Sequence, residues 1–145
     1  MKIIKIWFED DRIYGETEDH RKLWQSLLWY PRLRNASDEE RANYTFGLDG
    51  IHWRNINDDV SFESFGYDNR EPQGISRFFL SHREINASAV ARRAGISPNL
   101  MAQYISGAKI PSKERERLIM QTVMNIGNEI AMAAKEINAR PYMTT

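Results

Sequence analysis

The sequence predicts an α+β fold in which a small N-terminal domain of mixed sheet and helix precedes an all-α domain. Short β-branched and aromatic runs separated by turn formers fill the first half of the 145 residues, which also contains all four tryptophans. The second half has helical periodicity. Between them lies the polar stretch YDNREPQG. We therefore expect domains at 1–68 and 75–145, joined by a linker at 69–74.

The composition is that of a globular protein and excludes several kinds of site. Hydrophobic residues make up 41% of the chain and charged residues 28%. The chain has no cysteine, and its three histidines (His20, His52 and His82) lack the spacing of metal ligands. No stretch approaches the ~20 apolar residues of a membrane helix, and no leader is evident. We expect no metal, no cofactor, no membrane association and a cytoplasmic location.

The net charge of zero conceals an uneven distribution. Residues 1–74 contain 10 basic and 15 acidic side chains, whereas residues 75–145 contain 10 basic and 5 acidic ones. The first half thus carries −5 and the second +5. Only the second half carries a net positive charge, which favours binding to a polyanion such as a nucleic acid.

The first elements form a predicted antiparallel sheet. Lys2–Phe8 is rich in isoleucine and aromatic residues, an acidic turn follows, and Arg12–Thr17 alternates polar and apolar residues. This pattern predicts a hairpin, with a third short strand at Lys22–Trp24.

The next residues favour short helices and a second hairpin. Pro31 disfavours a regular helix within the apolar stretch Leu27–Arg34. Ser37 and Glu40 form a capping box, which predicts a short helix through Asn43. Two further elements are expected: a hairpin over Tyr44–Trp53, and a helical turn that Asn57-Asp58-Asp59 caps and that carries Val60, Phe62 and Phe65.

Four helices are expected in the second half. They cover 75–82, 87–94, 98–106 and 112–138. Gly95 supplies a turn with positive φ after the second of them, and Ser97-Pro98 is an N-cap followed by a favoured first helical residue. Ile96 is expected to fill the space between the helices at 87–94 and 98–106. Met101, Tyr104 and Ile105 form an inward stripe on the third helix.

This segment, AVARRAGISPNLMAQYISGAKIPS, resembles the helix-turn-helix domains of the λ-repressor/Cro type. In that family the N-terminal residues of the second motif helix face base edges in the major groove. Carried over by position, the base-facing residues are Pro98, Asn99, Ala102 and Gln103, and those beside phosphates are Arg92, Arg93, Ser106, Lys109 and Lys113. The resemblance implies a DNA-binding transcriptional regulator, with double-stranded DNA as partner.

Two departures from the family keep an alternative open. The family often has a glutamine near the start of the first motif helix, where this chain has Ala87, and the exposed face of the recognition helix lacks arginine and lysine. The alternative is a protein-interaction module, for toxin neutralisation or assembly, whose helix-turn-helix does not bind DNA.

The N-terminal half resembles a second family. LLWYPRLRNASDEERANY, then GIHWRNINDDVSFESF, are similar to small bacterial proteins grouped as a domain of unknown function. Some members are regarded as antitoxins, and some carry a helix-turn-helix after the first domain. The clearest signature is Gly50–Trp53 with Asp58–Ser61, although Arg54 replaces the family's frequent proline. The resemblance implies an antitoxin-type autoregulator.

The acidic half offers one cluster with catalytic residue types and one candidate docking surface. His52, Asp58, Asp59 and Glu63 lie close in sequence, but no nucleophile or phosphate-binding loop accompanies them, so we expect no catalytic site and no enzyme. The acidic surface comprises Glu9-Asp10-Asp11, Glu16, Glu18 and Asp19. If this surface has a role, a small basic protein such as a toxin fits it.

The last helix carries a heptad-like seam. Its apolar residues are Ile119, Val123, Ile126, Ile130, Ala133 and Ile137, at spacings of 4, 3, 4, 3 and 4. Gly127 in mid-helix indicates a close helix contact or a bend. The seam predicts a homodimer, and the alternative is one broad core face within the monomer.

Overall fold

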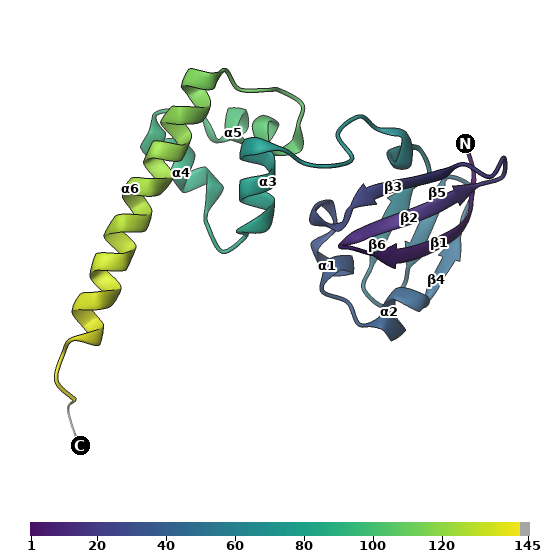
Figure 1. The fold of residues 1–145 in the computed structure, drawn as a ribbon, viewed down its shortest axis with the longest axis horizontal. Coiled ribbons are helices and arrows are strands. Elements are labelled where there is room, and N and C mark those ends of the chain that lie inside the picture. Colours follow the sequence, from purple (N-terminus) through teal and green to yellow (C-terminus); the bar gives the residue numbers. More distant parts are fainter. Residues whose placement is uncertain (143–145) are drawn as a thin grey trace. The chain divides into compact units, whose positions relative to one another are not determined.

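The computed structural model describes residues 1–142, which form two compact units, Met1–Ser81 and a second unit that starts at His82. The first contains β1 (Ile3–Glu9), β2 (Arg12–Thr17), β3 (Lys22–Ser26), α1 (Pro31–Arg34), α2 (Asp38–Ala42), β4 (Tyr44–Phe46), β5 (Gly50–Trp53), β6 (Asp58–Ser61) and α3 (Gly74–Ser81) (Figure 1). The second contains α4 (Ala87–Ala94), α5 (Pro98–Ser106) and α6 (Lys113–Asn138). Helix α3 thus counts with the first unit, whereas the sequence-based division placed 75–81 in the second domain. The last three residues of that predicted domain, 143–145, lie outside the described range.

The mixed architecture of small antiparallel sheets followed by helices agrees with the predicted α+β class. The first sheet has the order β1-β2-β3, so the hairpin and the third strand are confirmed. Asp10 and Asp11 connect β1 to β2 with φ of 52° and 61°. Two successive residues with positive φ are typical of the tight turns that match the twist of paired strands.

The second sheet has the order β4-β5-β6 and corrects one prediction. The hairpin over Tyr44–Trp53 is present as β4 and β5. The helical turn expected from Asn57 begins later than predicted: Asp58–Ser61 forms strand β6, paired with β5, and a 3-10 turn that includes Phe65 follows at Glu63–Gly66. Asp58 and Val60 are buried and Asp59 and Ser61 exposed, which is the period-2 alternation of a strand. Asn57, with φ of 48°, lies in the turn before β6.

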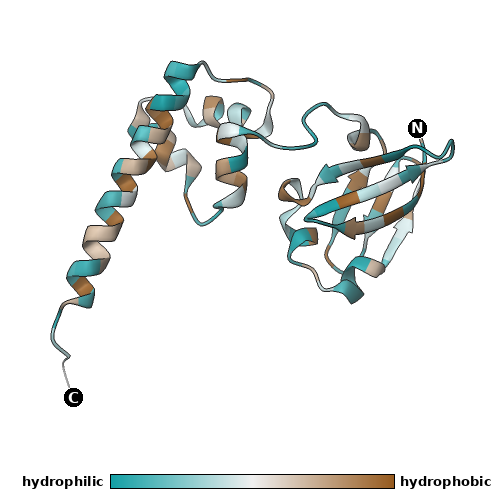
Figure 2. Cartoon of the chain, in the orientation of Figure 1, coloured by the Kyte–Doolittle hydropathy of each residue, from teal (hydrophilic) through white to brown (hydrophobic). Residues whose placement is uncertain are grey.

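The hydrophobic core of the first unit includes residues from both sheets. Its buried members are Ile3, Ile6, Ile13, Leu27, Leu33, Ile51, Trp53, Val60, Phe62 and Phe65. In Figure 2, apolar and polar positions alternate along the strands of both sheets. As expected, no regular helix runs through Leu27–Arg34: a 3-10 turn covers Leu27–Trp29, and Pro31 is the first residue of the short helix α1. Proline is tolerated at this position because its missing N–H has no partner in the first turn.

A buried polar network lies beneath the first sheet. The Tyr30 hydroxyl donates to Gln25 Oε1 at 2.8 Å, and Gln25 Nε2 donates to Ser64 Oγ at 2.8 Å. Burial raises the pKa of the Tyr30 phenol, although its hydrogen bond to Ser64 acts in the opposite direction. The folded state therefore retains this proton to a higher pH than the unfolded chain does.

This network predicts a pH-dependent difference between the protein and Tyr30→Phe. At pH 7 the variant should be less stable by about 1 kcal/mol, because Gln25 loses a hydrogen bond. The difference should shrink as the pH rises above about 10. There the Tyr30 phenol ionises in the unfolded chain, and this ionisation lowers the stability of the wild type but has no counterpart in the variant. Urea unfolding of the wild type and the variant at several pH values measures the stability difference at pH 7 and its decrease at higher pH. A gap that stays constant through this range would contradict the assigned shift.

The second unit consists of three helices whose predicted positions are confirmed. Ser112 caps α6, its Oγ accepting from the N–H of Arg115 at 3.1 Å. Buried apolar side chains come from all three helices and the turn between α4 and α5: Val90, Ala91, Ile96, Met101, Tyr104 and Ile119. No helix within residues 1–142 combines the length and apolar character needed to cross a bilayer.

Candidate nucleic-acid interface

Gly95 and Ile96 form a hydrogen-bonded stop at the end of α4. Gly95 has φ of 80° and ψ of 24°, and its N–H donates to the Arg92 carbonyl at 3.2 Å. The N–H of Ile96 donates to the Ala91 carbonyl at 3.0 Å. These two bonds are those of a Schellman motif, which favours glycine at its left-handed position. No atom lies within 4 Å of a Cβ built on Gly95, so the backbone conformation alone requires glycine there.

Helix α5 begins two residues later with its own cap. Ser97 is extended, and its Oγ accepts from the N–H of Leu100 at 3.1 Å. Pro98 occupies the first helical turn, and Gly107, with φ of 84°, ends the helix. The direction change between α4 and α5 is therefore specified by Gly95 through Pro98.

The base-facing set predicted from the sequence lies on the exposed side of α5. Of this set, Asn99, Ala102 and Gln103 are all exposed, and the exposed Ser106, which was predicted to lie beside phosphate, continues the same helical face. Pro98 is half-buried. Met101 and Tyr104 are buried on the opposite side, and Ile105 is half-buried. Within residues 1–142, the side chains of Asn99 and Gln103 form no hydrogen bond.

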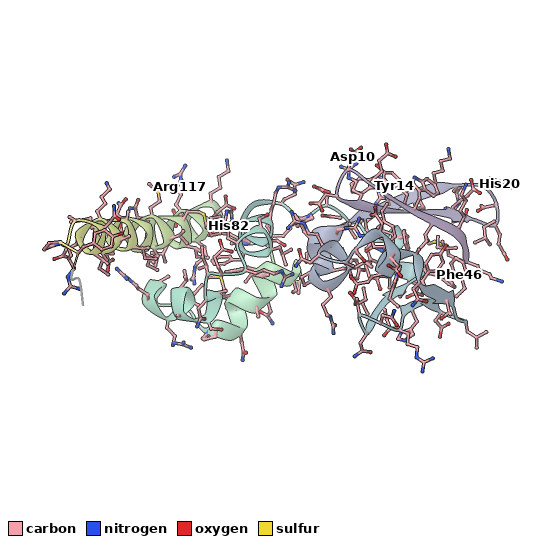
Figure 3. The ribbon with its side chains drawn as sticks, turned by 90° about the horizontal axis from the view of Figure 1, so that it is seen from below. Asp10, Tyr14, His20, Phe46, His82 and Arg117 are labelled. Carbon is pink, nitrogen blue, oxygen red and sulfur yellow. The ribbon has the colours of Figure 1, made fainter. Side chains whose placement is uncertain are left out.

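The predicted phosphate-facing residues differ in their surroundings. Arg92, Lys109 and Lys113 are exposed and form no ion pair with any described side chain. Arg93 instead forms an ion pair with Glu129 of α6. Arg117, which the prediction did not include, is also exposed, on α6 one turn after Lys113, and the i, i+4 spacing places both on one face of the helix (Figure 3).

The catalytic residue types of the first unit are only partly brought together. His52 Nδ1 lies 2.6 Å from Asp59 Oδ1, and the two residues are cross-strand partners on an exposed face. Asp58 is buried on the other face, where its carboxylate accepts from the N–H of Asp59 at 3.0 Å. In the described part of the chain, no group of three or more His, Asp or Glu side chains could hold a metal ion.

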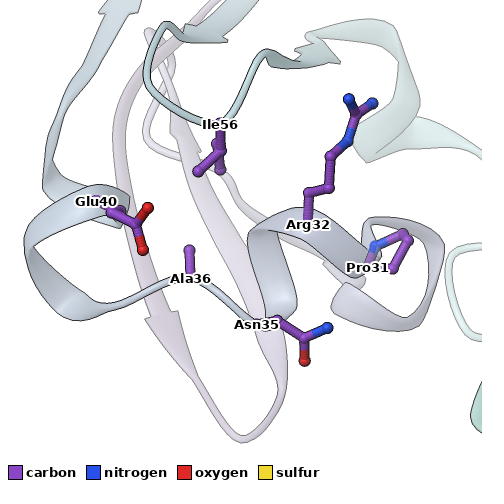
Figure 4. Close-up of a pocket in the computed structure, with 6 residues that line it drawn as sticks. All are labelled: Pro31, Arg32, Asn35, Ala36, Glu40 and Ile56. Carbon is purple, nitrogen blue, oxygen red and sulfur yellow. The ribbon is translucent and has the colours of Figure 1, made fainter.

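A shallow cleft of about 390 Å³ opens beside α1 and α2. It is lined by Pro31, Arg32, Asn35, Ala36, Glu40 and Ile56 (Figure 4). The Glu40 carboxylate accepts from the N–H of Ser37 at 2.9 Å, as the capping box predicts. This leaves the Arg32 guanidinium and the Asn35 amide as its uncommitted polar groups, and Figure 4 shows their polar ends pointing in opposite directions, so the cleft presents neither a paired anion site nor a nucleophile with a base.

The acidic residues of the first unit do not form one surface. Asp10 and Asp11 lie in the β1–β2 turn, whereas Glu18 and Asp19 lie beyond the other end of β2 (Figure 3). Basic residues pair with three of these acids: Arg34 with Asp11 at 3.0 Å, Arg21 with Asp19 at 3.1 Å, and Lys2 with Glu18 at 3.8 Å. A hydrogen bond from Thr17, followed by Arg21, lowers the pKa of Asp19. The expected acidic docking surface is thus divided, and three of its six carboxylates are paired with basic residues.

An aromatic row crosses the outer face of the first sheet and was not anticipated. Trp7 stacks on Tyr14 with ring centroids 5.5 Å apart, and Trp24 is the partner of Tyr14 on β3. The Arg12 guanidinium lies 3.7 Å from the centre of the Trp24 ring, and Arg70 lies 5.2 Å away. The ring faces are therefore occupied by internal contacts, which stabilise the sheet.

Comparison with known families identifies the first unit. Residues 3–67, which include both sheets, match a family described as a protein of unknown function. A DUF2442 domain covers residues 3–67. The signature Gly50–Trp53 and Asp58–Ser61 of this DUF2442 domain is the hairpin of β5 and β6. Helices α3 to α6 lie beyond the match. No curated protein and no solved structure matched the chain.

Proposed function

We propose that α4 and α5 form a helix-turn-helix that binds duplex DNA, and that the protein is a DNA-binding transcriptional regulator. One observation carries the proposal. The hydrogen-bonded turn at Gly95 leaves a polar face of α5, with Asn99 and Gln103 exposed and without hydrogen bonds among the described residues, and Arg92 in the last turn of α4 is exposed as well. A second motif helix with an exposed polar N-terminal face is the element that such proteins place in the major groove.

The side chains of this face have the chemistry for reading bases. The amides of Asn99 and Gln103 can form paired hydrogen bonds with adenine, and the Ala102 methyl can contact a thymine methyl group. Arg92, Lys109 and Lys113 would meet phosphates and contribute affinity on any sequence. Arg93, paired with Glu129, would contribute less than the other basic residues.

The proposal is tested by fluorescence anisotropy with a labelled duplex from the promoter of the protein's own gene and with a scrambled duplex, at two salt concentrations. Tighter binding to the promoter is the expected result. Arg92→Ala with Lys109→Ala should weaken binding to both duplexes and reduce the salt slope by about 0.9 for each lost phosphate contact. Lys135→Ala, at an exposed position near the end of α6, is the matched control and should change neither property.

Base reading is tested separately with Asn99→Ala and Gln103→Ala. Each should remove about 1 to 3 kcal/mol of discrimination at the contacted base pair and leave the salt slope unchanged. Equal loss on the promoter and scrambled duplexes would mean that this face does not read bases.

The second candidate function is that of a protein-interaction module. The absence of arginine and lysine from Asn99, Ala102, Gln103 and Ser106 favours it, because groove-reading helices rely heavily on arginine. Failure to bind either duplex at low salt would select this candidate. The exposed face of α5 would then contact a protein instead of DNA. Whether that partner is a toxin, as the antitoxin resemblance implies, stays a prediction.

A further inference from the structure

Helix α6 continues well beyond the core of its own unit. Ile119 is fully buried, Val123 and Ile126 are half-buried, and every residue from 127 to 138 is exposed. Among these exposed residues are Ile130 at 63%, Met132 at 71% and Ile137 at 66% of their full surface. Figure 2 shows apolar positions recurring to the end of the helix. Helices of about three turns are marginal in water without packing, so the exposed half of α6 requires a contact.

An apolar groove lies next to this exposed half. Its volume is about 440 Å³, and it runs between the start of α4 and the middle of α6. Ile85, Ala89 and Val90 line one side, and Val123, Ile126, Gly127 and Ile130 line the other. The ion pair between Arg93 and Glu129 joins the two helices beside the groove. Its apolar walls fit an apolar helix.

Gly127 has no explanation within a single copy. A Cβ built on it would meet no atom within 4 Å, and its φ is not positive. Glycine at a helix interior costs about 1 kcal/mol relative to alanine. A residue without a side chain at a groove lining is instead what a close approach of a second helix requires.

We propose that a second copy of this chain fills the groove, with the two α6 helices packed antiparallel about a two-fold axis near Gly127. The seam is self-complementary in this arrangement. Heptad a positions (Val123 and Ile130) meet d positions (Ala133 and Ile126) of the other copy, and Gly127 lies opposite Gly127. Each exposed half thus covers the groove of the other copy. This proposal does not depend on DNA binding.

Charge and burial favour this occupant and this orientation. The seam and its Met120–Gly127–Ala134 flank carry no charge. The other flank carries Glu129, which is paired with Arg93, and Glu136, which lies exposed at the edge of the seam. The a and d positions themselves therefore bury no charge. A parallel pair would place Ile119 opposite its own equivalent, but that residue is already covered by the core of its unit.

Sedimentation velocity of the full chain without DNA, from 1 to 100 μM, tests the association. We expect a dimer whose dissociation constant rises at least 100-fold in Ile130→Asp and at least tenfold in Gly127→Ala. Asn128→Asp adds the same charge on the opposite face of α6 and should leave the dimer unchanged. Far-UV circular dichroism should show Gly127→Ala to be at least as helical as the wild type, which separates weaker association from unfolding.

Orientation is tested by single cysteines, because the chain contains none of its own. In the antiparallel pair, Gly127→Cys lies beside the axis and, above the dissociation constant measured for Gly127→Ala, should form an intermolecular disulfide. Two copies of Ile137→Cys lie about 27 Å apart and should not. Cross-linking of both variants would mean a parallel pair, and a monomeric wild type at 100 μM would overturn the proposal.

Discussion

Trp53→Ala is expected to reduce the stability of the first unit by about 3 to 5 kcal/mol, enough to unfold a marginal domain at physiological temperature. Trp53 is fully buried between the two sheets' apolar side chains, and its Nε1–H donates to the Arg41 carbonyl at the end of α2 at 2.9 Å. Truncation leaves a large cavity and an unpaired carbonyl. Scanning calorimetry of the full chain should show one transition lost or shifted well downward.

Trp29→Ala provides the matched control for this truncation. Trp29 is half-buried, and its Nε1–H donates to the Asn69 carbonyl at 3.1 Å. The same atoms are removed, but much less buried surface is lost, so the transition should move by a smaller amount. Similar shifts for the two variants would contradict the central position of Trp53 in the core.

Gly50→Ala is expected to cost about 3 kcal/mol, near the upper end of the range for overpacking, because backbone must move. A Cβ on Gly50 would lie 2.5 Å from the Val60 carbonyl oxygen and 3.0 Å from the Ser61 Cα, on the neighbouring strand β6. No rotamer change can relieve a contact with backbone. Hydrogen exchange should show loss of protection across β5 and β6.

Gly47→Ala is the control for this substitution, three residues earlier in the same hairpin. A Cβ there would approach only the Gly50 carbonyl oxygen, at 3.6 Å, which is an ordinary contact. We expect a change of less than about 0.5 kcal/mol, as for other exposed sites. Equal loss of protection in both variants would show that the hairpin tolerates neither side chain and that the close contact at Gly50 is not the cause.

The helices of the second unit were predicted closely because their ends depend on neighbouring residues. Gly95 needs a left-handed backbone, and Ser97 and Ser112 accept from N–H groups three residues ahead. Such signals act within one turn and are visible in the sequence. The exposed polar face of α5 followed from the same periodicity.

Predictions that depended on distant contacts were less successful. From its neighbours in sequence, Asp58 is predicted to cap a helix, but the pairing of β6 with β5 gives it a strand conformation. The tendency of a residue to form a strand depends on the neighbouring strand, which a local sequence pattern does not show. The ion pair of Arg93 with Glu129 joins residues 36 positions apart. The acidic residues that appear adjacent in sequence were separated because β2 carries them to opposite ends of a sheet.

The two units carry different optical reporters. All four tryptophans lie in the first unit, at positions 7, 24, 29 and 53, whereas the 26-residue helix α6 lies in the second. Emission excited selectively from tryptophan therefore reports on the DUF2442 domain alone, and ellipticity at 222 nm is dominated by the helical unit. A denaturant titration that is followed both by tryptophan emission and by ellipticity at 222 nm can reveal whether the two units unfold together or independently, without any label or truncation.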